Sequence, residues 1–425
     1  MDFLNYRSLN LMQFSGLSTF QLLAFIRRAI FYTFLSIFLR SLGLTTTETT
    51  LMATIGMIAN SGAQVFLWGP LLDRFHSSKS FVIIGEGVAG LGHFALFWVF
   101  QGYYNSGLEK TSGFSIIVGL GFIEIWWSMS NVGWSTLISE LTDPTERKQL
   151  MGQLSIIGGF GGIIGATLGG QLFDGGLGFI HGILFYIPAI IMVISALLVA
   201  IVIKSKDIPK YEENKKSTPL SSLDRRVLSI FLIFIVSLVF INFGRNSIAI
   251  ISSLYLAEPT GVNASDVQIA NYRNVSSLAS MIAGIIIGGV INNQDDFKVM
   301  ALGALPAMGG ILILAASNDY LIVLISAFLV GSAQVVIQAS SYSIVARIAP
   351  ENFRGRLFSY YNATFFLSWG IAATVVTGPI SDYFIAQNFG IGDSYRMSFL
   401  AAAFLVLIGS IILVYSSKRT KSLDH

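Results

Sequence analysis

Two arginines lie deep inside long apolar segments of the chain, Arg28 within residues 17–41 and Arg245 within residues 227–257. Each is 12 or 13 residues from the end of its segment, which is about 20 Å of helix and past the midplane of a bilayer. A central arginine costs about 2.5–3.5 kcal/mol on insertion scales, so the fold must offset it. A structural ion pair or carbonyl contact is one interpretation. The other is a pair of guanidinium forks that hold an anion.

Arg27 stands about 100° around the helix from Arg28, so both cannot face the same direction equally. Glu124 lies in the middle of the apolar segment 113–140 and shares a helix face with Trp127, Ser128 and Asn131. Burial favours the protonated form of a carboxyl group, so Glu124 is a candidate proton carrier. It is equally a candidate ion-pair partner of Arg27 or Arg28, and the sequence leaves both open.

Further polar residues fall within apolar segments. Gln334 and Gln338 share a helix face, and Gln338 follows Asn131 by 207 residues, at the matching place of the second half. Polar stripes of this kind indicate the wall of a cavity rather than a surface against lipid. Glu86 and His93 are seven residues apart and share a face; packing against a neighbouring helix and a proton path are the two interpretations.

The elements that position these residues are apolar segments of spanning length. The chain has 425 residues, 53% hydrophobic and 12% charged, about half the charged fraction of a soluble domain. Twelve segments are near the 20-residue spanning length; they cover 17–41, 50–72, 80–101, 113–140, 149–171, 178–203, 227–257, 265–291, 298–317, 320–347, 355–384 and 395–416. The polar interval 204–226 predicts a linker between two six-helix halves.

The composition argues against other classes of protein. There is no cysteine, the four histidines are far apart in sequence, and no phosphate-binding loop of the G-x4-G-K-[ST] type occurs. An enzyme, a metal site, a cofactor and a nucleic-acid partner are therefore not expected. Basic residues divide unevenly between the two ends of the segments, nineteen on one side against three on the other. The positive-inside rule then places both termini in the cytoplasm.

The two halves also repeat each other. The loop that begins Gly69-Pro70 and ends at Lys79 recurs 219 residues later, from Gly288 to Lys298. In this loop, Asp73 is expected to end the second helix. We expect its side chain to lie near the N-terminus of the eleventh helix, where free backbone N–H groups and Arg354 or Arg356 would stabilise its negative charge.

With this loop, the chain resembles the major facilitator superfamily over its whole length. The family's loop pattern G-x-L-x-D-R is matched by Gly69, Leu71, Asp73 and Arg74, and Lys79 follows one place late. The family's antiporter pattern of the fifth helix is met by five glycines, with Ala166 in place of its proline; they are Gly152, Gly161, Gly165, Gly169 and Gly170. These glycines are also typical of plain helix packing.

The resemblance implies an all-α membrane protein with twelve transmembrane helices in two pseudo-symmetric six-helix bundles, residues 1–203 and 227–425. It implies alternating access around a central cavity lined by helices 1, 4, 7 and 10. Organic-anion carriers of the superfamily have one arginine in helix 1 and one in helix 7. We therefore expect a proton-coupled secondary transporter, monomeric in the plasma membrane, that favours a small anionic substrate. The alternative is a multidrug-type antiporter for hydrophobic or cationic compounds.

These expectations assign roles to particular residues. Substrate contacts are expected from Arg28, Arg245, Asn131, Gln334, Gln338 and Trp127. Proton coupling is expected from Glu124 or Glu86, and gating from the loop with Gly69, Asp73, Arg74 and Lys79 together with Arg354 and Arg356.

Overall fold

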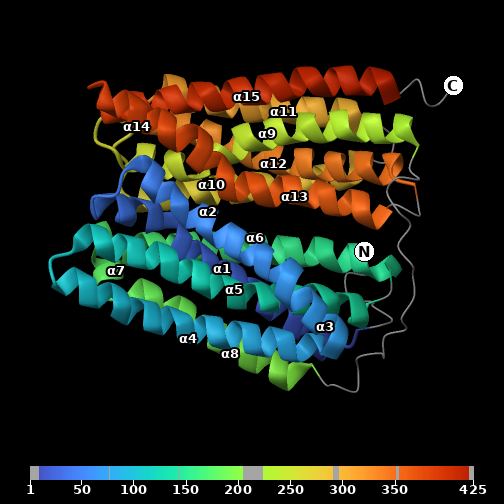
Figure 1. Ribbon diagram of the computed structural model, residues 1–425, viewed down its shortest axis with the longest axis horizontal. Coiled ribbons are helices and arrows are strands. Elements are labelled where there is room, and N and C mark those ends of the chain that lie inside the picture. The colour runs from blue at the N-terminus through green and yellow to red at the C-terminus, as the bar shows by residue number, and fades with distance from the viewer. Residues whose placement is uncertain are drawn as a thin grey trace. The chain divides into compact units, whose positions relative to one another are not determined.

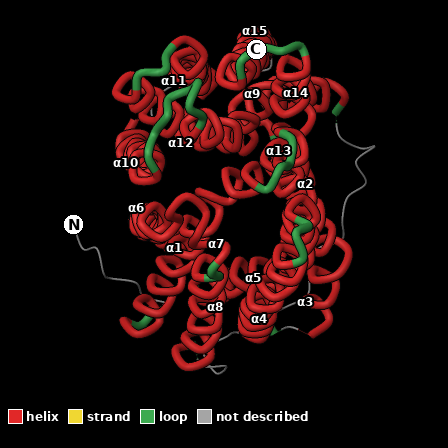
Figure 2. Tube along the Cα trace, turned by 90° about the vertical axis from the view of Figure 1, so that its left-hand side faces the viewer, coloured by secondary structure: helices red, strands yellow, loops and turns green. Residues whose placement is uncertain are grey.

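The computed structural model describes residues 9–75, 77–142, 144–203, 224–290, 296–350 and 354–420, and within these ranges every regular element is a helix (Figure 2). Eleven of the described helical segments are long and apolar enough to cross a membrane. The predicted span 265–291 corresponds to α10 (Asp266–Val290), a 25-residue helix. The expected all-α membrane fold is confirmed.

Two compact units divide the chain. Unit 1 contains residues 1–44 and 55–213, and unit 2 contains residues 45–54 and 214–425. The first turns of α2 (Thr46–Ala63) thus group with unit 2, where the carboxylate of Asp382 accepts the backbone N–H groups of Thr46 and Thr47 at 2.9 and 2.8 Å. This interaction caps the positive end of that helix.

The helices of unit 1 run roughly parallel to one another (Figure 1). They are α1 (Leu11–Ser41), the later part of α2, α3 (Gly69–Phe75), α4 (Ser78–Asn105), α5 (Glu109–Leu141), α6 (Pro144–Phe173), α7 (Leu177–Ile180) and α8 (Ile183–Val202). Phenylalanines fill one end of this bundle, where Phe31 makes edge contacts with Phe179 and Phe185. Asn10 starts α1 with a reciprocal capping interaction with Gln13.

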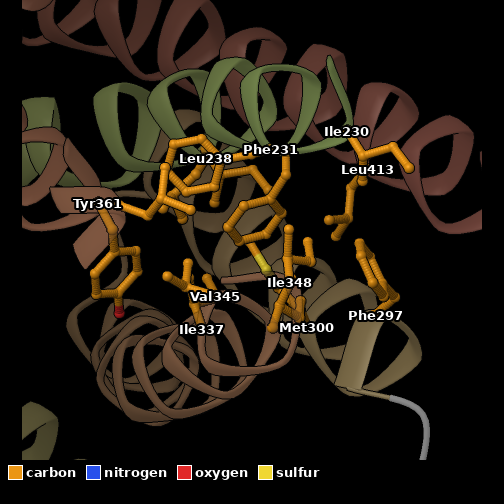
Figure 3. Packing of buried hydrophobic residues seen from close by; sticks show 14 of the residues in the cluster. Ile230, Phe231, Leu238, Phe297, Met300, Ile337, Val345, Ile348, Tyr361 and Leu413 are labelled. Carbon is orange, nitrogen blue, oxygen red and sulfur yellow. The ribbon is translucent and has the colours of Figure 1, made fainter. Parts of the chain in front are cut away.

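Unit 2 contains α9 (Arg225–Ala257), α10, α11 (Asp296–Ala316), α12 (Tyr320–Ile348), α13 (Arg354–Ala372), α14 (Gly378–Ala386) and α15 (Ile391–Thr420). Figure 3 shows part of its core, where Phe231 and Leu238 of α9 pack with Ile337 and Val345 of α12. In a water-soluble protein, burial of each such side chain stabilises the fold by about 1.5–3 kcal/mol. Between membrane helices, close van der Waals packing provides the stabilisation instead.

Two of the spans contain a π-helical turn, η1 (Gln64–Trp68) between α2 and α3 and η7 (Ala373–Thr377) between α13 and α14. In each, the N–H of the next residue, Gly69 or Gly378, bonds to a carbonyl five residues earlier. A proline follows that glycine in both spans and cannot donate a helical N–H. The expectation that Asp73 ends the second helix is wrong by two residues, because α3 continues to Phe75.

Candidate functional site

A buried ion pair joins α1 to α4 in unit 1. One Nη of Arg27 lies 3.1 Å from a carboxylate oxygen of Glu86, and both side chains are buried. Ser130 of α5 donates its hydroxyl to the same oxygen at 2.9 Å. Breaking such a pair leaves an uncompensated charge in a low-dielectric interior, so Arg27 and Glu86 stabilise each other's ionised forms.

Arg28 is in a different environment from its neighbour. Its side chain is exposed, and its guanidinium lies 5.5 Å from the ring centre of Trp127, against 5.0 Å for that of Arg27. Both distances are within cation–π range, so the half-buried indole of Trp127 attracts both arginines. Of the two adjacent arginines, Arg28 is therefore the one without a carboxylate partner among the described residues, and its role in substrate binding stays a prediction.

Glu124 is buried among neutral donors. The Tyr32 hydroxyl donates to one carboxylate oxygen at 3.0 Å, and the Asn60 amide donates to the other at 2.7 Å. The described residues place no arginine within ion-pair distance of Glu124, although Arg27 and Arg28 are near enough to interact electrostatically. Glu86 and Glu124 thus differ, because a cation is paired with Glu86 and none is paired with Glu124 among the described residues.

Three partners of this network were not expected from the sequence: Tyr32, Asn60 and Gln64. The Gln64 amide donates to the Asn60 carbonyl oxygen at 2.6 Å and so extends the chain of hydrogen bonds from Glu124. A signal was present, because Asn60 and Gln64 are four residues apart on one face of an apolar span. Tyr32 likewise follows Arg28 by four residues.

Arg245 on α9 is a buried charged residue of unit 2. It is 4% exposed, and one Nη donates to the Asn242 carbonyl oxygen at 3.2 Å. The Nε of Arg245 and the Nδ2 of Asn242 make no hydrogen bond within the described part of the chain. No ion pair between Arg245 and a carboxylate occurs there either. Two adjacent buried donors therefore stand without acceptors.

The expected amide residues lie at varied depths. Asn131 and Gln334 are half-buried, and Gln338 is exposed. The backbone carbonyl of Gln338 accepts the hydroxyl of Tyr361 at 3.2 Å, and Tyr361 is close enough to Arg245 to interact electrostatically. Arg245 and this part of α12 are thus linked through Tyr361, and a substrate role for the three amides stays a prediction.

Three of the five glycines on α6 pack closely on α1. A methyl group on Gly161 would lie 2.6 Å from the Leu22 carbonyl oxygen, one on Gly165 would clash with the Ile26 carbonyl, and one on Gly169 would lie 3.0 Å from the Ile30 carbonyl. These contacts hold the turn of α1 that carries Arg27 and Arg28. Gly152 faces open space, and Gly170 is buried.

The expected gating residues are only partly described. Gly69 follows the π-turn, and Lys79 donates to the carbonyl of Ala200 in the last turn of α8 at 2.9 Å. The Arg74 guanidinium lies 5.8 Å from the ring centre of Phe75. The side chains of Asp73, Arg354 and Arg356 are outside the described part of the structure, and so is the contact expected between them.

With this geometry established, comparison with known proteins decides the family. The model of the Major Facilitator Superfamily matches residues 17–373 and 234–424. The chain belongs to this superfamily. It is therefore a multi-pass membrane protein and a transporter whose substrate is unspecified, since the members of the superfamily are transporters and not enzymes. No curated protein matches the chain.

Solved structures of the superfamily share the fold. A mutant form of the nucleoside transporter NupG has 15% identity and a TM-score of 0.74, and the match covers 95% of this chain and 99% of that one. A bacterial homologue of the iron transporter ferroportin has 15% identity and a TM-score of 0.71 over 96% and 100% of the two chains. A bacterial homologue of the human lysosomal transporter Spinster has 14% identity and a TM-score of 0.70 over 96% of both. At identities this low, the similarity shows a shared fold and does not identify the substrate.

Proposed function

We propose that this superfamily member is a proton-coupled transporter of a small organic anion. The observation that carries the proposal is the state of Arg245, which is buried in unit 2 without a carboxylate partner among the described residues. A buried charge is retained at a cost of several kcal/mol unless something neutralises it. A bound anion would supply both the charge and the acceptors that Arg245 Nε and Asn242 Nδ2 need.

The proposed anion carries a carboxylate or phosphate group. The guanidinium plane of arginine fits two oxygen atoms at once, and the adjacent Asn242 amide adds a third donor. Within unit 1, Arg28 is the proposed anion contact, because Arg27 is already paired with Glu86 whereas Arg28 has no carboxylate partner among the described residues. Trp127 would then present an apolar surface to the organic part of the substrate.

The proposed proton carrier is Glu124. Its two partners, Tyr32 and Asn60, are neutral, so no fixed cation holds the carboxyl group in its ionised form. Glu86 has such a cation in Arg27 at 3.1 Å, which makes it the structural member of the two candidates. Proton exchange at Glu124 would let the binding of the anion and of the proton depend on each other.

Calorimetry on the purified transporter tests the anion site. The probes are a panel of small organic carboxylates and phosphate esters, with a set of lipophilic cations for comparison. Arg245→Lys keeps the charge but loses the planar fork, so anion affinity should fall at least tenfold.

Arg273→Lys is the matched control, because Arg273 is satisfied by the Ala249 carbonyl and the Ser253 hydroxyl at 2.6 and 2.8 Å. Its anion affinity should stay near that of the wild type. Anion affinity within twofold of wild type in Arg245→Lys, or binding of the cations alone, would favour the alternative function, the export of hydrophobic or cationic compounds.

We also propose that both termini face the cytoplasm of the plasma membrane and that the transporter acts as a monomer. The support is the distribution of basic residues between the two ends of the spans. The chain contains no cysteine, so a Ser217→Cys variant carries a single thiol. A membrane-impermeant thiol reagent should label it only after the cells are opened, and labelling in intact cells would contradict this orientation.

A further inference from the structure

The π-turn η1 is fastened to α5 at both of its ends. At its start, the Gln64 amide bonds to Asn60, and Asn60 bonds to the Glu124 carboxylate, at 2.6 and 2.7 Å. At its end, the Trp68 indole N–H donates to the carbonyl of Ile125 at 2.6 Å. Glu124 and Ile125 are consecutive residues, so both fastenings meet α5 at one place.

The end of this turn is also packed, because the Trp68 ring contacts the rings of Phe81 and Trp126. Its middle residues are exposed, with exposed fractions of 66% for Val65, 84% for Phe66 and 41% for Leu67. The next helical turn contains Pro70, which has no N–H to donate back to the π-turn. Turns of this kind are rare and frequently lie at functional sites. The conformation of η1 therefore depends on the side chains of Gln64 and Trp68.

We propose that Asn60 and Gln64 are positioning residues that pass the protonation state of Glu124 to the π-turn. This inference rests on the proposed role of Glu124 as proton carrier. The ionised carboxylate accepts the Asn60 amide N–H, and the Asn60 carbonyl oxygen then accepts from Gln64. The three side chains form a chain of hydrogen bonds that all point toward Glu124.

Protonation of Glu124 reverses the direction of its hydrogen bond with Asn60. A proton on the oxygen that faces Asn60 makes that oxygen a donor, and two donors cannot face each other. The Asn60 amide must turn so that its carbonyl oxygen accepts the new O–H, which takes that oxygen away from Gln64. The Gln64 amide then loses its acceptor and must turn as well, so the start of η1 rearranges relative to α5 while the Trp68 end stays bonded.

Other ionisable groups surround Glu124 and could respond to pH. Arg27, Arg28 and Tyr32 of α1 interact electrostatically with Glu124, and Glu86 and His93 of α4 interact with Arg27. Glu86 is paired with Arg27, and the His93 ring bonds to the carbonyl of Ala89. α2 contributes the neutral Asn60. The test must therefore separate Glu124 from these groups.

Two spectroscopic measurements on the reconstituted full-length protein make this separation. Infrared difference spectra between alkaline and acidic buffer report the C=O band of a protonated carboxyl group, and the part lost in Glu124→Gln belongs to Glu124. Spin labels at Phe66→Cys on η1 and Leu91→Cys on α4 report the movement, since both positions are exposed and in unit 1. A label pair at Leu91→Cys and Val118→Cys, with no member on α2, is the reference.

The pair at residues 66 and 91 should shift its distance distribution on acidification, and the reference pair should not. Glu124→Gln should hold the acidic distribution at both pH values. Gln64→Leu and Asn60→Leu should each lose the shift while the infrared band of Glu124 persists. Tyr32→Phe, which removes the other partner of Glu124, and Gln101→Leu, which removes the amide pair of Gln101 and Asn105 on α4, should keep the shift.

A Glu124 band without a distance shift would overturn the relay and leave the proposed proton carrier in place. A shift that survives in Glu124→Gln would overturn the relay as well, because another group would then be its source. The absence of any Glu124 band would contradict both the relay and the proposed proton carrier. A shift retained in both Gln64→Leu and Asn60→Leu would exclude the two amides.

Discussion

At the scale of residues, the buried arginines of the two units have different partners. Arg27 has a carboxylate at 3.1 Å, whereas among the described residues Arg245 has the amide oxygen of Asn242 at 3.2 Å and no carboxylate. An arginine inside a membrane protein is tolerated when it is paired or when it faces a polar ligand. The first arrangement suits a structural role, and the second supports the proposed contact with an anion.

The Arg27–Glu86 pair should therefore contribute to stability. Removing one member, as in Arg27→Gln or Glu86→Gln, leaves a buried unpaired charge and should cost about 3–5 kcal/mol. The double variant should recover much of this loss, since neither charge remains. Thermal unfolding of the purified variants measures it, with Arg28→Gln as the control because Arg28 is exposed. Equal unfolding temperatures for Arg27→Gln and Arg28→Gln would contradict the structural role.

The sequence predicts which residues are unusual but not how they pair. Arg27, Arg28, Glu86 and Glu124 stand out because charges are rare within spans. Their partners depend on contacts between helices; Tyr32, for example, is 92 residues from Glu124. A single sequence contains no pattern that identifies which residues of different helices are in contact.

At the scale of elements, the apolar segments predict the spans well and their irregularities poorly. The expected span 17–41 is α1, which begins six residues earlier at Leu11, and the expected span 227–257 ends with α9 at Ala257. The π-turns of the second and eleventh spans were not predicted. A π-turn adds one residue to a single helical turn, and the hydrophobic pattern, which is averaged over 11–18 residues, hardly changes as a result. The Gly-Pro pairs at Gly69 and Gly378 were the available signal.

The glycines of α6 offer a test of packing against a special antiport role. Gly165→Ala places a methyl group against the Ile26 carbonyl of α1 and should destabilise the protein by about 1–3 kcal/mol, the usual cost of overpacking. Gly152→Ala is the matched control in the same motif, because open space surrounds Gly152. It should be neutral or slightly stabilising. Unchanged thermal stability in Gly165→Ala together with lost transport would instead support a direct antiport role.

At the scale of the whole molecule, the sequence predicts the fold class because length, hydropathy and the repeat of the halves all agree. The division of chemistry between the halves follows only from the structure. Unit 1 contains the buried Glu86 and Glu124. In unit 2 the buried Asp296 is paired with Arg347, and Arg245 has no carboxylate partner among the described residues. We infer from this difference that unit 1 provides the proton carrier, Glu124, and that unit 2 provides the buried arginine of the anion site, Arg245.

Proton flux in proteoliposomes tests this central proposal most directly. Vesicles that contain the transporter and a pH-sensitive dye receive an outward or inward gradient of the organic anion that binds most tightly in calorimetry. The gradient should change the internal pH in the wild type, and both Glu124→Gln and Arg245→Gln should abolish the change, each by removing one of the two coupled ligands. A pH change that persists in both variants, or one that arises only with a lipophilic cation, would contradict a proton-coupled anion transporter.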